Sequence, residues 1–184
     1  TNHHNINNNH NNTLNTNTPN NNTHNTTQPT THTTTTNSTA TVVAIHIAPG
    51  SRVPMKAVDS VMVETGRGIV GDRYHGTRHR HVTVQSLEEL ARAAEKHGAP
   101  IDPGLTRRNV TLSAGEIPRK PGHRWRVGAV LLDVVRDAAP CKLLEATLGR
   151  DVKRALHRKA GVVCRVLVGA ALGLGASVDF GPLA

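Results

Sequence analysis

Residues 81–98, HVTVQSLEELARAAEKHG, contain the clearest structural signal in the chain. Two β-branched valines on either side of a threonine favour a short strand over residues 81–85. Ser86 then has the side chain of a helix N-cap, and Glu89, three residues later, completes the pattern of a capping box. Leucine and alanine recur at helical spacing until Gly98, a residue type that commonly ends helices. We therefore predict a strand that leads directly into a capped helix.

Short β-rich runs lie on both sides of this strand and helix, and glycine or proline separates them. The runs that we predict as further strands are 42–47, 58–63, 109–112, 127–135, 162–168 and 177–180. Many short strands with one or two inserted helices are typical of a barrel and not of a doubly wound sheet. The pattern predicts a mainly β, β-barrel-like fold with a few helices.

Composition divides the chain near residue 40. Residues 1–40 consist almost entirely of Asn, Thr and His, without a charged residue. Such a segment cannot bury enough apolar surface to offset the entropy of ordering its backbone, so we predict a disordered tail. Its five histidines are irregularly spaced, and it lacks the pattern of a secretory signal. We expect one folded domain over residues 41–184.

The predicted domain contains all 22 basic and 13 acidic residues, which give the chain a formal net charge of +9. A basic surface attracts phosphorylated cofactors, nucleotides or nucleic acid. With one Trp, one Tyr and one Phe, the chain offers no stacking platform for single strands, so we do not expect nucleic acid as its partner. It has two cysteines, no Cys-x-x-Cys pair and no membrane-length apolar run. We expect a soluble, cytoplasmic protein.

Cys141 follows a predicted strand and begins a stretch that favours a helix, with Pro140 before it. A helix N-terminus and the adjacent cation Lys142 both favour the thiolate form, which can bind a metal or carry sulfur. Cys141 is therefore a candidate reactive residue, and an inert, packed cysteine is the alternative. Cys164 lies in the apolar run 162–168, where we expect a core residue.

A glycine-rich, basic loop follows the strand predicted at 58–63. Its start, 66–71, has the spacing of the dinucleotide-binding fingerprint, but no apolar helical period follows, so we do not predict a Rossmann unit. The glycines allow a tight turn, Asp72 can accept backbone N–H bonds, and the cationic side chains suit an oxyanion. A solvated basic loop and a zinc site are the alternatives. The cations are Arg73, His75, Arg78 and Arg80, and a zinc site would use His75, His79 and His81.

A second cationic element, RRNV at 107–110, places an amide side chain where a strand begins. Together with GIVGDRYH at 68–75 and PCKLL at 140–144, it resembles the motifs of the MOSC domain. That family is named for the C-terminal domain of molybdenum-cofactor sulfurases. The resemblance extends over 42–180 and is greatest to short, standalone bacterial MOSC proteins. Ala176 stands where relatives commonly have an aspartate.

The resemblance implies a β-barrel-like MOSC fold that binds the molybdenum cofactor, a phosphorylated pterin dithiolene. It also implies that Cys141 carries sulfur as a persulfide or binds molybdenum. Some relatives are molybdoenzymes, so a separate electron-transfer protein or a sulfur donor is an expected partner. Pyridoxal phosphate is not expected, because no lysine has a recognisable pyridoxal setting. The residues implied in cofactor binding are Gly71, Asp72, Arg73, His75, Arg108 and Asn109, with Lys142 beside Cys141 to keep it ionised.

Two classes of function follow from the sequence. The first is a molybdenum-dependent oxidoreductase component or a sulfur carrier that works through Cys141. The second is a non-enzymatic basic module that binds nucleic acid or another polyanion, in which Cys141 is merely packed. The substrate, the oligomeric state and the choice between metal ligand and persulfide do not follow from the residues.

Overall fold

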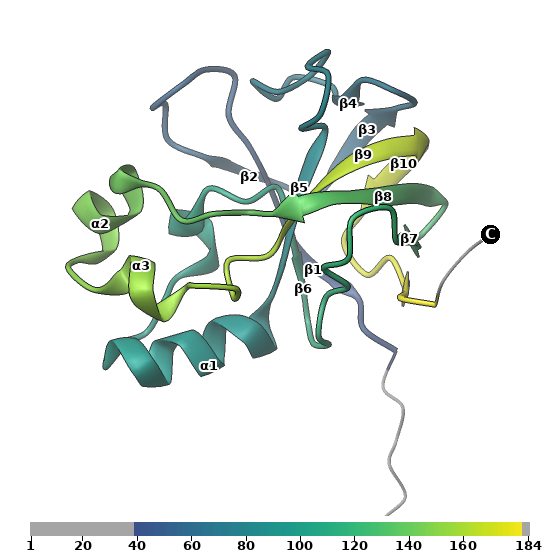
Figure 1. Cartoon of the computed structure of the whole chain (residues 1–184). Coiled ribbons are helices and arrows are strands. Elements are labelled where there is room, and N and C mark those ends of the chain that lie inside the picture. The colour runs from purple at the N-terminus through teal and green to yellow at the C-terminus, as the bar shows by residue number, and fades with distance from the viewer. Residues whose placement is uncertain (1–38, 182–184) are drawn as a thin grey trace, which may run out of the picture. The chain divides into compact units, whose positions relative to one another are not determined.

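The computed structural model describes residues 39–181. Its strands form an eight-stranded sheet in the order β11-β7-β8-β9-β5-β6-β1-β2 and a three-stranded sheet in the order β10-β3-β4 (Figure 1). The strands are β1 (Val42–Ile47), β2 (Lys56–Val58), β3 (Ser60–Glu64), β4 (Gly68–Ile69), β5 (Val82–Ser86), β6 (Val110–Leu112), β7 (Arg124–Val127), β8 (Val130–Asp137), β9 (Val162–Val168), β10 (Ala171–Gly173) and β11 (Val178–Asp179). The helices are α1 (Leu87–His97), the 3₁₀ turn η1 (Pro103–Thr106), α2 (Lys142–Leu148) and α3 (Val152–Ala155).

Backbone hydrogen bonds join the start of β1 to the segment before β11, at the far end of the large sheet. The Val42 N–H donates to the Ala176 carbonyl over 2.9 Å, and the Val178 N–H donates to the Ala40 carbonyl over 2.8 Å. The sheet therefore curves back on itself, which confirms the predicted mainly β, barrel-like fold. Ala40 is buried in the core, so the domain includes one residue that the sequence assigned to the tail. The rest of the predicted tail, residues 1–38, lies outside the described residues.

The barrel is filled by aliphatic side chains around Trp125, whose side chain is fully buried. Within the run predicted as a strand at 58–63, buried and exposed residues alternate: Val61 and Val63 belong to this core, while Met62 is 54% exposed. The chain breaks at Asp59, so the run forms two strands, β2 and β3. A second apolar cluster joins α1, α2 and α3 on one side of the barrel, as Figure 1 shows.

Helix α1 begins where the sequence predicted, but it does not contain a capping box. Ser86 occupies the N-cap position, and its side chain makes no capping hydrogen bond. The carboxylate of Glu89 instead accepts a bond of 2.6 Å from Arg119, a residue 30 positions away. The C-terminus is as predicted: Gly98 has a φ of 78°, and its N–H donates to the Ala94 carbonyl.

Strand β5 pairs in parallel with β6 and antiparallel with β9. The connection between β5 and β6 consists of α1 and η1, which is the kind of crossover that a parallel pair requires. Because β5 and β6 run in parallel, the glycine-rich basic loop before β5 and the Arg-Asn element before β6 end beside each other, at one end of the barrel. None of the helices within residues 39–181 is both long and apolar enough to cross a membrane.

Candidate functional site

The glycine–aspartate loop and the Arg-Asn pair meet in one buried hydrogen-bond network. The carboxylate of Asp72 accepts bonds from the Ala48 N–H, the Tyr74 N–H and the Asn109 side-chain amide, each over 3.1 Å. This confirms that Asp72 fixes its loop through backbone N–H groups. Gly71, immediately before it, has a φ of 82°, which a residue with a side chain rarely adopts.

Asn109 uses both ends of its amide inside the protein. Its Oδ1 accepts from the Thr83 backbone N–H and hydroxyl, over 3.1 and 2.8 Å. Its Nδ2 donates to the His46 carbonyl and to Asp72. Asn109 therefore ties β5, β1 and the loop of Asp72 together. We conclude that Asp72 and Asn109 act on the site by holding its framework.

Arg108 is also turned inwards, with only 4% of the residue exposed. Its Nε donates to the Ala160 carbonyl over 2.7 Å, and one terminal nitrogen donates to the carbonyls of Ala138 and Ala139 over 2.9 and 3.3 Å. Burial, followed by repulsion from Arg80, lowers the pKa of Arg108 to about 10. The side chain thus secures the segment that leads into Cys141.

Two further arginines contact the ring of Tyr74. The guanidinium carbon of Arg80 lies 3.9 Å from the ring centroid, and that of Arg73 lies 4.5 Å from it. Asp72 lies 3.6 Å from Arg73, while the Arg80 Nε is buried without a hydrogen-bond partner among the described residues. Burial, together with the charges of Arg73 and Arg136, lowers the pKa of Arg80.

Arg107 completes what we call the arginine cluster: Arg73, Arg80, Arg107, Arg108 and Arg136. Arg107 adopts a left-handed conformation, with a φ of 63°, and donates to the Val53 carbonyl over 2.7 Å. Burial and the charge of Arg73 lower its pKa. The negative charge beside this cluster comes from the carboxylate of Asp72, which already accepts three hydrogen bonds. The cluster therefore has an excess of positive charge that favours an anion.

Cys141 lies at the N-cap of α2, at the helix start that the sequence predicted, and the structure shows that it is exposed. It is close enough to Arg107 and Arg108 for a thiolate there to raise the pKa of both guanidinium groups. Lys142 follows as the exposed first residue of the helix. Cys164 is fully buried in β9, and burial raises the pKa of its thiol strongly. The two cysteines thus lie in the environments that the sequence indicated.

The comparison with protein families places this site in a known fold. A family model described as the MOSC domain matches residues 71–179, more than half of the 184-residue chain. The chain belongs to the MOSC domain family. Its structure is similar to that of YuaD from Bacillus subtilis, with 23% identity, a TM-score of 0.66, and coverage of 76% of this chain and 94% of that one.

Two other solved structures share the fold. YiiM from Geobacillus stearothermophilus is 20% identical with a TM-score of 0.60, covering 76% of this chain and 74% of its own. YiiM from Escherichia coli is 18% identical with a TM-score of 0.54, covering 75% and 68%. A search of the curated proteins gave no match.

In this MOSC domain the N–H of His75 donates to the Asp72 carbonyl over 3.0 Å, but its side chain lies apart from the contacts that link the other motif side chains. Its Nε2 is 3.0 Å from the carboxylate of Glu64 at the end of β3. His81 accepts the Val166 N–H at its Nδ1, over 3.0 Å. Within residues 39–181 no group of three or more His, Cys, Asp or Glu side chains could hold a metal ion. The structure therefore does not support the zinc site considered from the sequence.

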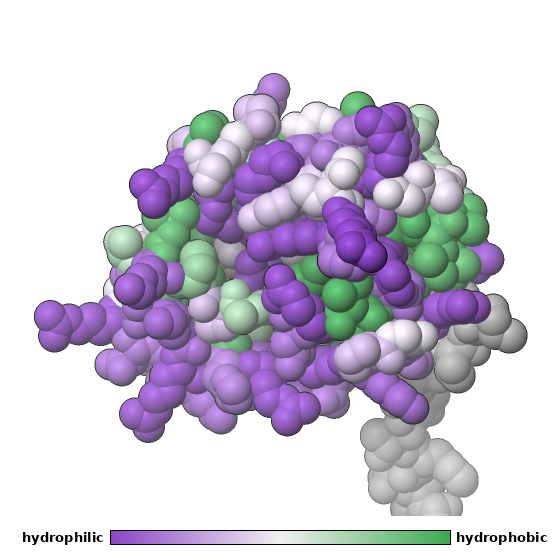
Figure 2. All heavy atoms as spheres, turned by 45° about the horizontal axis from the view of Figure 1, so that its top comes forward, coloured by the Kyte–Doolittle hydropathy of each residue, from purple (hydrophilic) through white to green (hydrophobic). Residues whose placement is uncertain are grey.

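Beside the cluster, the MOSC domain has a cavity of about 280 Å³ that the motifs did not reveal. It is bounded by the loop between β1 and β2, by η1 and by α2, and Arg107 forms part of its wall. Figure 2, in which the top of the view in Figure 1 is turned forward, shows apolar patches between hydrophilic side chains on the surface of the domain. Apolar wall residues such as Met55, Leu105 and Leu143 come from three separate segments, so no local pattern could have identified them.

Proposed function

We propose that this MOSC domain binds the molybdenum cofactor and that Cys141 provides the thiol that works with it. The observation that carries the proposal is the exposed thiol of Cys141 beside an arginine cluster with excess positive charge. A soft sulfur ligand and an anion-binding surface side by side suit a ligand that has both a metal–sulfur centre and a phosphate.

The described residues fit such a group. Arg80 has a buried Nε without a partner, and burying a guanidinium donor without an acceptor is costly, so a bound anion would relieve that cost. We assign the anionic end of the cofactor to Arg80 and Arg107, with Arg73 contributing charge. Arg108, Asn109 and Asp72 hold the loops in place, and Gly71 permits the turn between them.

When bound, the cofactor would supply molybdenum redox chemistry or accept sulfur. The chain's own contribution is to hold the exposed thiol of Cys141 at the edge of the cluster, beside the positive charges of Arg107 and Arg108. Lys142 adds a further charge in the first turn of α2. The adjoining cavity is suited to a small acceptor molecule, and a separate electron-transfer protein or sulfur donor would complete the reaction.

The test is to produce the full chain in a host that makes the cofactor and to measure bound molybdenum and pterin per protein. We expect both in the native chain and a loss of pterin in Arg80→Ala and Arg107→Ala. Arg124→Ala is the matched control, because Arg124 is an exposed arginine on β7 outside the cluster. Normal pterin content in both cluster variants would refute the proposal.

A nucleic-acid module makes a different prediction for the same protein. Binding of an oligonucleotide to phosphate-contacting residues would weaken steeply with salt and would not depend on Cys141. We expect Cys141→Ser to remove the metal or the sulfur. Mass spectrometry before and after reduction distinguishes the two roles, because only a persulfide adds a sulfur atom that a reductant removes. Salt-sensitive oligonucleotide binding without bound molybdenum would favour the basic-module function instead.

A further inference from the structure

The cavity beside the arginine cluster combines an apolar wall with two cations. Its apolar side chains come from the loop between β1 and β2, from η1 and from α2, and both cations are arginines. No Asp or Glu is among the residues that line it. The residues that define its chemistry are Pro54, Met55, Leu105 and Leu143 on the apolar side, with Arg52 and Arg107.

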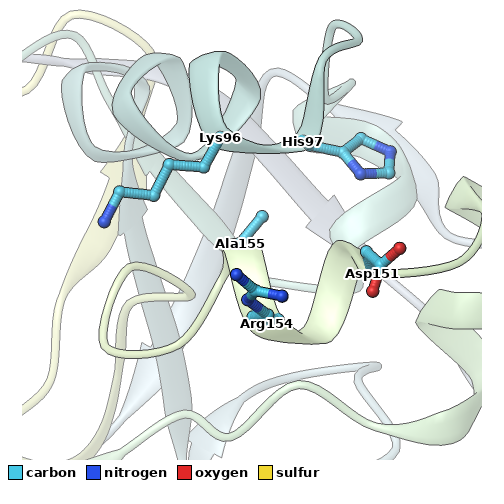
Figure 3. Close-up of a pocket in the computed structure, with 5 residues that line it drawn as sticks. All are labelled: Lys96, His97, Asp151, Arg154 and Ala155. Atoms are coloured by element: carbon cyan, nitrogen blue, oxygen red, sulfur yellow. The ribbon is translucent and has the colours of Figure 1, made fainter.

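The larger cavity of the domain, of about 560 Å³ between α1 and α3, is different in kind (Figure 3). Asp151 lines it together with Lys96 and Arg154, so charges of both signs surround it. Figure 3 also shows that Lys96 extends away from Arg154. That cavity favours neither an anion nor a cation, whereas the one beside the arginine cluster has charge of a single sign.

The two arginines of this cavity are available to a ligand. Within residues 39–181 neither forms an ion pair, and Arg107 uses one terminal nitrogen to donate to the Val53 carbonyl over 2.7 Å. Their φ angles are 62° for Arg52 and 63° for Arg107, and the described chain has four non-glycine residues with positive φ. Such backbone is uncommon outside glycine and is often kept where a protein holds a ligand. An anion at this cavity would therefore meet two unpaired guanidinium groups.

The apolar wall is accessible and lies next to the proposed reactive centre. Leu105 is 42% exposed and Leu143 is 36% exposed, so an apolar group in the cavity would remove both from water. Cys141 and Leu143 both belong to the start of α2. The sulfur of Met55 accepts a hydrogen bond from Arg73 over 3.2 Å, which joins this wall to the arginine cluster.

The cavity has few acceptors for a ligand that donates hydrogen bonds. Its lining contains no Asn, Gln or His, and its one hydroxyl, that of Thr147, already donates to the Leu143 carbonyl over 2.9 Å. The Val53 carbonyl accepts from Arg107. A sugar or a nucleobase brings several O–H or N–H donors, and burying these without acceptors is costly. The wall therefore favours an apolar body whose polar group is an acceptor.

We propose that this cavity binds a small carboxylic acid with an apolar body, and that such acids are the substrate class of the Cys141 site, an assignment that rests on the proposed function. The apolar body lies against Leu105, Leu143 and Met55. The carboxylate pairs with Arg52, while Arg107 adds positive charge from the side of the cluster. A volume of about 280 Å³ is at the lower end of the range for small-molecule sites, so the body is about the size of one aromatic ring.

The experiment titrates the full chain with phenylacetate, with its neutral counterpart phenylacetamide, and with acetate, which lacks the ring. Amide chemical shifts at residues 52–55, 104–105 and 143–147 report this cavity, and shifts at 72–80 and 138–142 report the arginine cluster and the Cys141 segment. We expect saturable shifts in the first set. Phenylacetate should bind about tenfold more tightly than either of the other two, because only it has both the apolar body and the charge.

Two substitutions test the charge and the apolar wall separately. Arg52→Gln should raise the Kd of phenylacetate about tenfold and leave that of phenylacetamide unchanged. Leu105→Asn should raise the Kd of both ligands several-fold, because both bury the ring. The matched controls are Arg124→Gln, at an exposed arginine on β7, and Leu174→Asn, at a leucine that is 47% exposed outside this cavity. Neither control should change any of the affinities.

Equal affinities for phenylacetate and phenylacetamide, or unchanged binding in Arg52→Gln and Leu105→Asn, would overturn the proposal. Shifts confined to 72–80 and 138–142 would do the same, because the acid would then bind at the arginine cluster. The titration does not require bound cofactor, so none of these results would affect the assignment of cofactor binding. A native chain without pterin that still bound phenylacetate in this way would refute the proposed function and leave the ligand preference of the cavity standing.

Discussion

The segment that carries Cys141 and the strand that carries Cys164 both adjoin β8, but they surround sulfur in opposite ways. Cys164 faces Val134 of β8 across the sheet and has no exposed surface. Cys141 follows the end of β8, exposed and beside a group of arginines. The same strand thus contributes to the core at its middle and leads to an exposed thiol just beyond its end. In this fold, distance from the barrel interior decides what a cysteine can do.

The largest expected effect comes from Cys141→Ser. Serine is close in size and Cys141 is exposed, so we expect little change in thermal stability. Loss of the sulfur atom should nevertheless abolish molybdenum retention or persulfide formation. The measurement is bound metal and sulfur per protein, with the melting temperature as a check on folding.

Cys164→Ser is the control for that change, because it puts a hydroxyl into the core at a cost of about 1–3 kcal/mol while the chemistry persists. Mild alkylation of the folded protein should label Cys141 and spare Cys164. If Cys164 proved to be the labelled and essential cysteine, Cys164 would be the accessible, functional thiol and Cys141 the inert one, contrary to our assignment.

Arg108→Ala should have the next largest effect, and on stability first. It removes three charge-assisted hydrogen bonds and leaves the carbonyls of Ala138, Ala139 and Ala160 without this donor. We expect a loss of about 3–5 kcal/mol in the free energy of unfolding, measured with urea. The rate of Cys141 alkylation should also become less uniform among the molecules, because the segment before Cys141 is no longer held in one position. A variant as stable as the native chain would show that Arg108 does not anchor the segment.

The sequence predicted what depends on neighbouring residues. Gly98 ends α1, Cys141 is the N-cap of α2, and Asp72 accepts the Tyr74 N–H of its own loop, each through short-range geometry. The burial of Cys164 was also predicted, because apolar β-branched residues surround it, whereas the sequence left both an exposed and a packed position open for Cys141.

What the sequence could not predict depends on partners far along the chain. Glu89 binds Arg119 instead of completing a capping box, because the fold brings residue 119 to the start of α1. Arg108 and Asn109 were expected to hold the cofactor, and in the structure their side chains bond to other parts of the protein: Arg108 to backbone carbonyls, and Asn109 to backbone and side-chain groups. The sequence alone does not distinguish an arginine that points into the protein from one that points towards the surface. The cofactor role therefore passes in our proposal to Arg80 and Arg107.

Arg80→Ala should sharpen this division of roles. Arg80 is desolvated and lies near other cations, so its removal should not lower stability and should relieve repulsion. Cofactor affinity should fall by about 1.5–3 kcal/mol, the range for hydrogen bonds to charged groups. Arg80→Lys should recover only part of it, because a bidentate guanidinium is lost. Equilibrium binding of the isolated cofactor gives the affinity. A large loss of stability with unchanged affinity would place Arg80 with Arg108 among the framework residues.

The smallest expected effect is a pH dependence of stability that arises from His81. His81 contacts β9, the buried strand that carries Cys164. Burial lowers the pKa of His81 below its usual value of 6.5, and its Nδ1 accepts the Val166 N–H of β9. A lowered pKa means that the unfolded chain takes up a proton first. Stability is therefore complete above pH 6.5 and decreases as the pH falls from 6.5 through the folded-state pKa. His81→Asn keeps an acceptor near the Nδ1 position but does not titrate, so its urea midpoint should change less over this range. Equal slopes in the two proteins would show that His81 is not the group responsible.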